Sequence, residues 1–374
     1  MGPDTTILSQ ELPTINPFGM LQREMPHDYY LRVGRASDLK DRKERFVYRL
    51  FEIFPGFLSL AFLGGAILTS WLFPVQAAFF MIAFVLYWFF RTLYFLFHLK
   101  AGYDKMKSYE KINWSEKLKE FPNWNRIFHL VILPTYKESY AVVRETINSL
   151  SLAEYPKDHM IVVLGIEEAE GKQGEQKAQI LKQEFGKTFF NFLVTHHKEG
   201  LPGEIPGKGS NENWAAQEAI RRVISKSKIP EENVIVSSFD ADTVVFPSYF
   251  SCLTYDYLKS RDRVRTSFQP VPLFLNNIWQ APAISKIFSF SSTFWHTINQ
   301  ERPEKLITFS SHAMSLKALK EVGFKQTNVV SDDSRIFWQC FLKIQDTRYT
   351  YPPFSFHDRY SNPPNSCNDR VWRP

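Results

Sequence analysis

The sequence is poor in cysteine and carries no strong excess of charge of either sign. Three cysteines, Cys252, Cys340 and Cys367, lie far apart in a chain of 374 residues. They match neither the ligand spacing of a zinc site nor a disulfide framework, and a reducing compartment is expected. The formal net charge is only +6 and is dispersed, which argues against a nucleic-acid partner. A mildly basic protein suits a membrane surface or an anionic substrate.

Several catalytic signatures are also missing. No Ser/His/Asp or Cys/His set has an identifying local pattern, so a hydrolase triad is not indicated, and a lone His312 is more typical of a structural hydrogen bond. The Gly200–Gly209 loop opens a helix, but Gly209 stands where a phosphate-binding loop would have Ser or Thr on Mg²⁺. Lys208 at that helix start still suits a phosphate or carboxylate. A capped helix with a solvated lysine explains the same residues.

One long stretch has no charged residue. About 38 uncharged residues separate Glu52 from Arg91, nearly two membrane spans at roughly 20 residues each. Pro74 interrupts the middle, which predicts a transmembrane helical hairpin with spans at Pro55–Phe73 and Val75–Leu96. A buried hairpin in a soluble protein is the alternative, and the length and lack of charge argue against it.

The glycines and the flanking charges of this stretch add two expectations. Gly64, Gly65 and Ala61 would let the two membrane helices approach closely. Basic residues flank both outer ends and are absent from the connection, so the positive-inside rule places both ends in the cytoplasm. The rest of the chain is then a cytoplasmic domain on a multi-pass anchor in the inner membrane. The flanking residues are Arg32, Arg35, Lys40, Arg42, Lys43, Arg45 and Arg49 before the hairpin, and Lys100, Lys105, Lys107 and Lys111 after it.

Beyond the hairpin, apolar segments of strand type alternate with helical patterns. This alternation predicts parallel βαβ units and an open α/β sheet. The aromatic segment from Phe274 to Trp295 is expected to pack in the core or at the membrane interface, with stacking against a glycan as the alternative. The expected strands are 128–133, 160–164, 190–194, 234–236 and 264–269, with a strand-like segment at 306–310; the expected helices are 138–152, 173–185, 211–225 and 316–322.

Two aspartates follow the expected strand at 234–236. Ligands of parallel α/β sheets bind just beyond the carboxyl ends of strands, and Asp240 and Asp242 stand one residue apart at such an end. Adjacent carboxylates repel each other unless a cation or proton lies between them. A divalent metal that carries a diphosphate fits, because Mg²⁺ is often held by one or two carboxylates and substrate phosphates. The alternative is a pair of solvated loop aspartates.

Further acidic residues follow other expected elements. Glu138 follows the first strand, where it could meet a nucleobase or ribose, although an acid favoured by the helix dipole is the simpler explanation. Glu167 follows the second strand at an equivalent level, or lies in a solvated loop. Asp332 and Asp333 open an amphipathic segment. One could be a general base while the other caps the helix, and capping is the commoner use of such a pair.

Taken in order, these segments resemble a family 2 glycosyltransferase of the GT-A fold, in particular the membrane-bound synthases of the cellulose, chitin and hyaluronan type. The resemblance covers about residues 127–345, and a membrane hairpin often precedes such a domain. It rests on Val131-Ile-Leu-Pro-Thr-Tyr-Lys-Glu138, Val162-Val-Leu-Gly-Ile-Glu167, Lys208-x4-Asn213-x-Ala215, Phe239-Asp-Ala-Asp242, Gln269-Pro270 and Ser331-Asp-Asp333.

The resemblance implies a reaction and a role for each matched residue. Asp242, with Asp240, would hold Mg²⁺ or Mn²⁺ on the diphosphate of a nucleotide-sugar donor, with UDP as the expected carrier. Asp333, with Asp332 beside it, would be the general base that activates a hydroxyl of a glycan or lipid acceptor. One displacement then inverts the anomeric centre without a covalent intermediate. The implied substrate-binding residues are Glu138, Glu167, Lys208, Asn213, Asp240 and Gln269.

The chain departs from that family in several places. Gly165-Ile166-Glu167 replaces the usual aspartate after the second strand, Ser-Asp-Asp replaces Thr-Glu-Asp, and Ser311-His312 replaces a small, Gly-rich turn. The Gln-x-x-Arg-Trp motif of processive members is missing, and no later membrane helices follow before Pro374. A truncated member, or a non-catalytic or partner-dependent sugar-nucleotide-binding subunit, is therefore an alternative. A nucleotidyltransferase is a weaker one, because no basic Gly-rich loop follows the first strand.

These expectations divide the chain into five parts. A cytoplasmic tail leads into the membrane hairpin, a linker joins the hairpin to the catalytic domain, and an irregular, incomplete tail ends the chain. The expected bounds are 1–50, 51–99, 100–126, 127–345 and 346–374.

Overall fold

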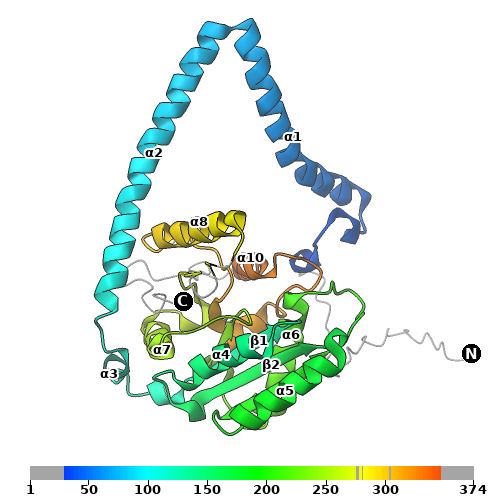
Figure 1. Cartoon of the computed structure of the whole chain (residues 1–374). Coiled ribbons are helices and arrows are strands. Elements are labelled where there is room, and N and C mark those ends of the chain that lie inside the picture. The colour runs from blue at the N-terminus through cyan, green and yellow to red at the C-terminus, as the bar shows by residue number, and fades with distance from the viewer. Residues whose placement is uncertain (1–28, 275–277, 280, 303–304, 347–374) are drawn as a thin grey trace, which may run out of the picture.

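The computed structural model describes residues 29–274, 278–279, 281–302 and 305–346. The first 28 residues of the expected polar tail, and the expected C-terminal tail beyond residue 346, lie outside these ranges. Two parts stand out in Figure 1: a long helical hairpin and an α/β domain below its open end.

Two long apolar helices form the hairpin. Helix α1 spans Arg42–Leu72 and α2 spans Pro74–Tyr109. Pro74 occupies the start of α2, where its missing N–H group needs no partner, so Phe73 alone separates the helices. Both are long and apolar enough to cross a membrane, and neither is buried by the rest of the protein. Helix α2 runs past the expected end at Leu96 into the segment that was expected to be a linker.

The expected close approach of the two helices is wrong. A methyl group added at Gly64 or Gly65 would have no atom within 4 Å, and the helices diverge from their turn in Figure 1. They touch through larger side chains, since the rings of Phe62 and Phe80 lie 6.3 Å apart. Small residues on one helix bring membrane helices together only when the facing surface also permits it, and α2 presents aromatic rings there.

The domain is built on a six-stranded sheet with the order β3-β2-β1-β4-β6-β5. Strands β3, β2, β1 and β4 are parallel, while β6 pairs antiparallel with both β4 and β5. This mostly parallel sheet with flanking helices confirms the predicted α/β fold class. The strands are β1 Phe128–Thr135, β2 Met160–Glu167, β3 Asn191–His197, β4 Val234–Ser238, β5 Ser267–Phe268 and β6 Ala313–Ser315.

Helices cover both faces of the sheet, which is why the central strands are apolar on both sides. Val131 and Leu133 of β1 face a core shared with α4, α5 and α7, whereas Leu130 and Ile132 face a core shared with α6, α9 and α10. The helices are α3 Trp114–Leu118, α4 Tyr140–Ser151, α5 Gly171–Phe185, α6 Lys208–Ala219, continued by a π-helical turn Ile220–Ile224, α7 Tyr249–Lys259, α8 Ala283–Asn299, α9 Leu316–Glu321 and α10 Asp332–Asp346.

Two expectations fail, one at the antiparallel edge of the sheet and one in α7. The segment 306–310 forms no strand, because the backbone N–H of Phe309 donates to the side chain of Gln269 (2.6 Å) instead of joining a ladder, and Ser311 is left-handed with φ 64°. The strand there begins at Ala313. In addition, Cys252 is disulfide-bonded, which the wide spacing of the cysteines did not indicate.

The strand order creates a topological switch point. The chain proceeds from β1 to β2 and β3 on one side, then returns to place β4 on the other side of β1. The segments that follow β1 and β4 therefore leave the sheet in opposite directions and open a crevice between them. Ligands of open α/β sheets bind at such a position.

Candidate active site

A cavity of about 870 Å³ lies at this switch point, within the range of roughly 300–1,000 Å³ that small-molecule sites occupy. Segments after β1, β2, β3 and β4 line it, together with the first turn of α6. Its wall is strongly acidic, so an anionic diphosphate would be repelled unless a cation accompanied it. The charged lining residues are Glu138, Glu145, Glu167, Glu199, Glu204, Asp240 and Asp242, against Lys198 and Lys208.

The two aspartates after β4 both line this cavity. Burial raises the pKa of Asp242 to about 6, and the negative charges of Asp240 and Glu138 add to this effect. A carboxyl group whose charge is so disfavoured suits a position beside a cation. The residues present therefore fit a divalent metal, which Asp242 and Asp240 would hold, and the predicted metal ligands remain a prediction.

Lys208 connects Asp240 to the second acidic pair. Its Nζ lies 2.7 Å from Oδ1 of Asp240 and 3.1 Å from Oδ2 of Asp333. The hydroxyl of Ser310 donates to the other oxygen of Asp240. One ammonium group at the first turn of α6 thus joins the end of β4 to the start of α10, and the negative charges around it hold its pKa above the usual range even though burial opposes this.

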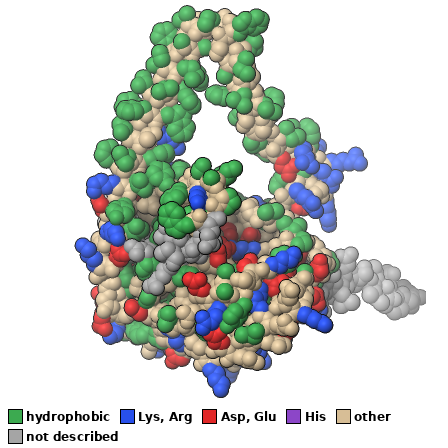
Figure 2. Space-filling model, in the orientation of Figure 1, with side chains coloured by type: hydrophobic (Ala, Val, Ile, Leu, Met, Phe, Trp, Pro, Cys, Tyr) green, Lys and Arg blue, Asp and Glu red, His purple; other side chains and the backbone are tan. Residues whose placement is uncertain are grey.

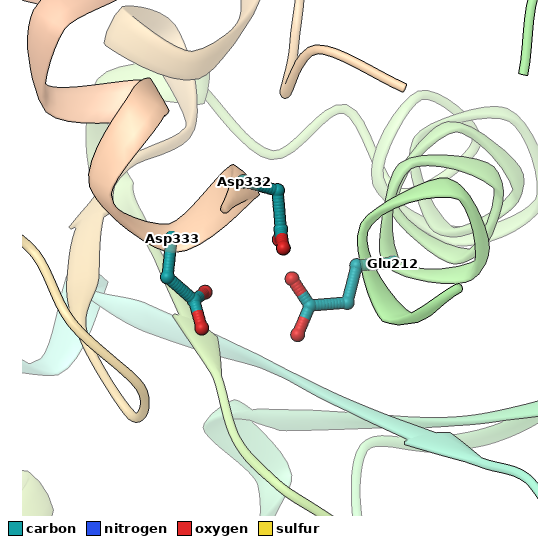
Figure 3. A group of neighbouring side chains, drawn as sticks. All are labelled: Glu212, Asp332 and Asp333. Atoms are coloured by element: carbon teal, nitrogen blue, oxygen red, sulfur yellow. The ribbon is translucent and has the colours of Figure 1, made fainter. Parts of the chain in front are cut away.

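Behind Lys208 lies a buried cluster of charges (Figure 3). The carboxylates of Glu212, from α6, and of Asp332 and Asp333, from the first turn of α10, point toward one another. Their oxygens are close enough to hold a metal ion, but the ammonium of Lys325 already lies among them. It contacts Glu212, lies 3.2 Å from Asp332 and lies 2.9 Å from Asp333. We therefore interpret this group as an ion-pair cluster.

The electrostatics of this cluster differ from one carboxylate to the next. Burial raises the pKa of Glu212 to about 7, against the attraction of the two lysines. Burial also opposes the charge of Asp333, but Lys325 and Lys208 outweigh it and hold the pKa of that carboxyl well below its usual range. His312 stays neutral, because burial and the charge of Lys325 lower its pKa to about 3.

Close packing around this site leaves no room for a side chain at two glycines. A Cβ at Gly209 would lie 2.8 Å from the side chain of Asp332, which explains why no Ser or Thr stands at this helix start. A Cβ at Gly165 would lie 2.3 Å from Oδ1 of Asn211, whose amide donates to the carbonyl of Gly165 at 3.1 Å. The departure from the resembled family after the second strand thus accommodates Asn211, which lines the cavity.

The other predicted substrate-binding residues divide into two groups. Glu138 and Glu167 line the cavity, and Glu167 accepts a hydrogen bond from Nδ1 of His197 at 2.9 Å. Asn213 and Gln269 are not among the cavity-lining residues. The buried carboxamide of Gln269 instead bonds the backbone of Phe309 and Ser310, so its contact with the site runs through the loop that holds Asp240.

Sequence reasoning missed four residues of this site. Lys325 and Glu212 complete the buried cluster, and Asn211 lines the cavity. His197 bridges Glu167 and Glu204, at 3.0 Å from the latter, and these two acids raise its pKa to about 9 although burial alone would lower it. The position of Glu212 one helical turn after Lys208 was a readable signal, whereas nothing local marked Lys325.

Comparisons with known proteins give only a distant likeness. No protein-family model and no curated protein matches the chain. Among solved structures, it is similar to the mannosyltransferase PcManGT from Pyrobaculum calidifontis in complex with GDP-Man and Mn²⁺, at 18% identity and a TM-score of 0.40, over 67% of this chain and 62% of that one. It is also similar to S. aureus TarS 1–349 in complex with UDP-GlcNAc, at 14% identity and a TM-score of 0.38, over 58% of this chain and 54% of that one. The chain thus spans less than two thirds of either structure.

Proposed function

We propose that this protein is a membrane-anchored, inverting glycosyltransferase of the GT-A type and family 2 kind, which uses a nucleotide-diphospho-sugar. The observation that carries the proposal is the pairing of Lys208 with both Asp240 and Asp333, beside a cavity at the switch point that Asp242 also lines. A sugar nucleotide needs a site of this size with a place for a cation, a phosphate-binding lysine and a base on the acceptor side.

The donor half of the site is the acidic cavity. Glu138 and Glu167 lie on the lining that follows β1 and β2, where they would accept hydrogen bonds from the nucleoside. Asp242 and Asp240 would hold Mg²⁺ or Mn²⁺, whose chemistry is to stabilise negative charge on the departing nucleoside diphosphate. The neighbouring mannosyltransferase structure contains GDP-Man and Mn²⁺, in keeping with this proposal.

Asp333 is the proposed general base, and its ion pairs set a condition on that role. One of its oxygens lies 3.1 Å from Lys208 and the other 2.9 Å from Lys325, so a carboxylate with such a depressed pKa is a weak base. Lys208 would turn from Asp240 and Asp333 toward the donor's phosphates, which frees one oxygen and raises basicity. Asp333 then takes the proton of the acceptor's hydroxyl group while the oxygen of that hydroxyl attacks the anomeric carbon. The bond from the anomeric carbon to the diphosphate breaks on the opposite face of the sugar.

The hairpin gives this domain its proposed location. The apolar lengths of α1 and α2 suit two membrane crossings, and basic residues flank only their outer ends, which favours a cytoplasmic domain at the inner membrane. A cytoplasmic domain has direct access to soluble nucleotide sugars. A glycan or lipid at the membrane is the proposed acceptor.

A second candidate is a non-catalytic or partner-dependent subunit that binds sugar nucleotides. The double ion pairing of Asp333 favours it, because a base held by two lysines does not act unless one of them moves. The two candidates differ in one property, which is the release of nucleoside diphosphate.

The test is nucleoside diphosphate release by the full chain purified in detergent. A panel of nucleotide sugars is screened with Mn²⁺ or Mg²⁺, for the unmodified protein and for Asp242→Ala and Asp333→Asn, with Asp158→Asn at an exposed surface carboxylate as the matched control. Metal-dependent release from one donor, lost in the two site variants and kept in the control, supports the transferase. Metal-dependent nucleotide binding without release supports the second candidate. Neither release nor binding refutes both.

Lys208→Met tests whether Lys208 contacts the phosphates of the donor. Loss of the ammonium removes the proposed phosphate contact, and we expect donor affinity to fall about tenfold or more, as for a lost charged hydrogen bond of about 1.5–3 kcal/mol. The measurement is nucleotide affinity by calorimetry with each metal. Unchanged affinity would show that Lys208 does not turn to the donor.

A further inference from the structure

Helix α8 has its polar and apolar faces reversed relative to a soluble protein. Along its first three turns the half-buried residues are all polar: Lys286, Ser289, Ser292 and Thr293. The hydroxyl of Thr293 donates to the carbonyl of Pro272 at 2.6 Å. The residues that face outward are mainly large and apolar, namely Ile284, Ile287, Phe288, Phe290, Phe294 and Trp295.

This outward face is a continuous apolar stripe. Ile287, Phe288, Phe294 and Trp295 lie 3, 4, 10 and 11 residues after Ile284, and at 3.6 residues per turn these offsets keep all five on one side of the helix. Phe288 is 71% exposed and the preceding Trp279 is 82% exposed. Figure 2 shows hydrophobic side chains gathered over α8 and over both legs of the hairpin. A contiguous exposed patch of such residues marks a surface that another apolar phase covers.

The position of α8 on α2 indicates which phase that is. A helix of roughly 20 residues, about 30 Å long, crosses the apolar part of a bilayer. Counted from Pro74 at the start of α2, such a crossing ends near Tyr94. Helix α8 contacts α2 at this level: the rings of Phe95 and Trp295 lie 6.1 Å apart, and a Cβ at Gly102 would lie 2.5 Å from the carbonyl of Thr297.

Contacts of charged groups lie at that level and beyond it. The guanidinium of Arg302 stacks over the ring of Tyr94 at 5.4 Å, and Lys105 lies 2.7 Å from Glu301. The C-terminal end of α8 is therefore fixed to α2 where apolar side chains give way to charged ones. Helix α8 itself runs across the base of the hairpin in Figure 1, between its two legs.

We propose that α8 lies in the plane of the bilayer surface, with its stripe in the boundary between headgroups and acyl chains. The inference rests on the membrane hairpin of the proposed function and adds a second, monotopic contact with lipid. A helix of this kind buries its apolar face about 5–10 Å into that boundary. The only charged residue of α8 is Lys286, so anionic lipids meet no like charge there.

This contact orients the proposed reaction site. Helix α8 joins the site through Gln300, whose amide donates to the carbonyl of Gln269 at 3.4 Å, and through the ring of His296, 5.0 Å from that of Phe309. The loop that follows holds Asp240 through Ser310. A helix docked on lipid thus holds this edge of the sheet at a fixed height and angle to the membrane.

The experiment is site-specific photocrosslinking of the full chain in vesicles of phosphatidylcholine and phosphatidylglycerol. Benzoylphenylalanine replaces one exposed phenylalanine at a time: Phe288→benzoylphenylalanine on α8, Phe84→benzoylphenylalanine in the hairpin and Phe190→benzoylphenylalanine on the sheet domain. The last two are matched, at 41% and 40% exposure. After irradiation, peptide adducts are identified by mass spectrometry.

We expect lipid adducts at position 288 in a yield comparable to position 84, attached near the headgroup end of the acyl chain, and none above background at position 190. Lipid adducts at position 84 without lipid adducts at position 288 overturn the inference and leave the membrane anchor intact. This holds whether position 288 gives no adduct, crosslinks to a second copy of the protein or crosslinks to the chain beyond residue 346. No lipid adducts at 84 would refute the membrane anchor and with it this inference. Nucleoside diphosphate release, measured on the same samples, tests the proposed activity separately.

Discussion

Lys325→Met tests whether the buried cluster of charges is held together by this one ammonium group. Lys325 is almost fully buried and contacts Glu212, Asp332 and Asp333 at once. Methionine has a similar length and fills the same space, so the substitution removes charge with little loss of packing. Three carboxylates then face one another with Lys208 as the remaining cation, 3.6 Å from Glu212 and 3.1 Å from Asp333.

The size of the effect follows from the cost of leaving buried charges without their partner. Removal of one partner from a buried ion pair costs about 3–5 kcal/mol. Glu212, whose pKa burial has already raised to about 7, is the carboxyl group that binds a proton most easily at pH 7, and this proton limits the loss. We therefore expect Lys325→Met to lower the free energy of unfolding by about 3 kcal/mol at pH 7, the lower end of that range.

The direction of the pH dependence is also determined. The folded variant binds more protons than the folded unmodified protein, and protons become easier to bind as pH falls. The stability loss caused by Lys325→Met is therefore expected to be smaller at pH 5 than at pH 7. Denaturant unfolding in detergent, followed by tryptophan fluorescence at both pH values, measures it.

A matched control is available on the surface. Lys320 pairs with Glu231, and both side chains are more than one third exposed, so Lys320→Met is expected to cost at most about 1 kcal/mol. Glu212→Gln combined with Lys325→Met removes one of the uncompensated charges and should cost less than the sum of the two single changes. If Lys325→Met costs no more than Lys320→Met, or if the double variant is additive, the cluster does not depend on Lys325.

Two further predictions concern the cavity wall. Gly165→Ala places a methyl group 2.3 Å from the Oδ1 position of Asn211, so we expect a loss of about 1–3 kcal/mol from overpacking together with weaker nucleotide binding; equal thermal midpoints for variant and unmodified protein would contradict this. His197→Gln removes an imidazolium that Glu167 and Glu204 hold charged, with its pKa raised to about 9. Because that pKa lies above the ordinary 6.5, its contribution is complete below pH 6.5 and disappears as pH rises through about 9. The difference in thermal midpoint between unmodified protein and variant should therefore shrink from pH 6 to pH 10, and a constant difference would show that His197 does not act through its charge.

The local periodicity of the sequence determined most of the fold. Alternating apolar strands and amphipathic helices predicted the parallel part of the sheet, and the uncharged stretch after Glu52 predicted the hairpin with its break at Pro74. These signals are local, because side-chain burial repeats every two residues in a strand and every 3.6 in a helix. The failures lie at 306–310 and at Gly64, where tertiary contacts decide the outcome: the side chain of Gln269 binds the backbone of Phe309, and no atom of α2 lies within 4 Å of a Cβ placed at Gly64.

The candidate site also contains some residues that the sequence indicates and others that only the tertiary structure brings in. Asp240, Asp242 and Lys208 could be recognised because a strand end and a helix start are local features that bring known chemistry with them. Lys325 could not, since its partner Glu212 is 113 residues away in the sequence and only the tertiary structure brings the segment between α9 and α10 against α6. The apolar stripe of α8 is also visible in the sequence, but an apolar stripe on a helix usually indicates the face that packs against the core. Only the tertiary structure determined that the polar face turns inward and leaves the apolar face exposed.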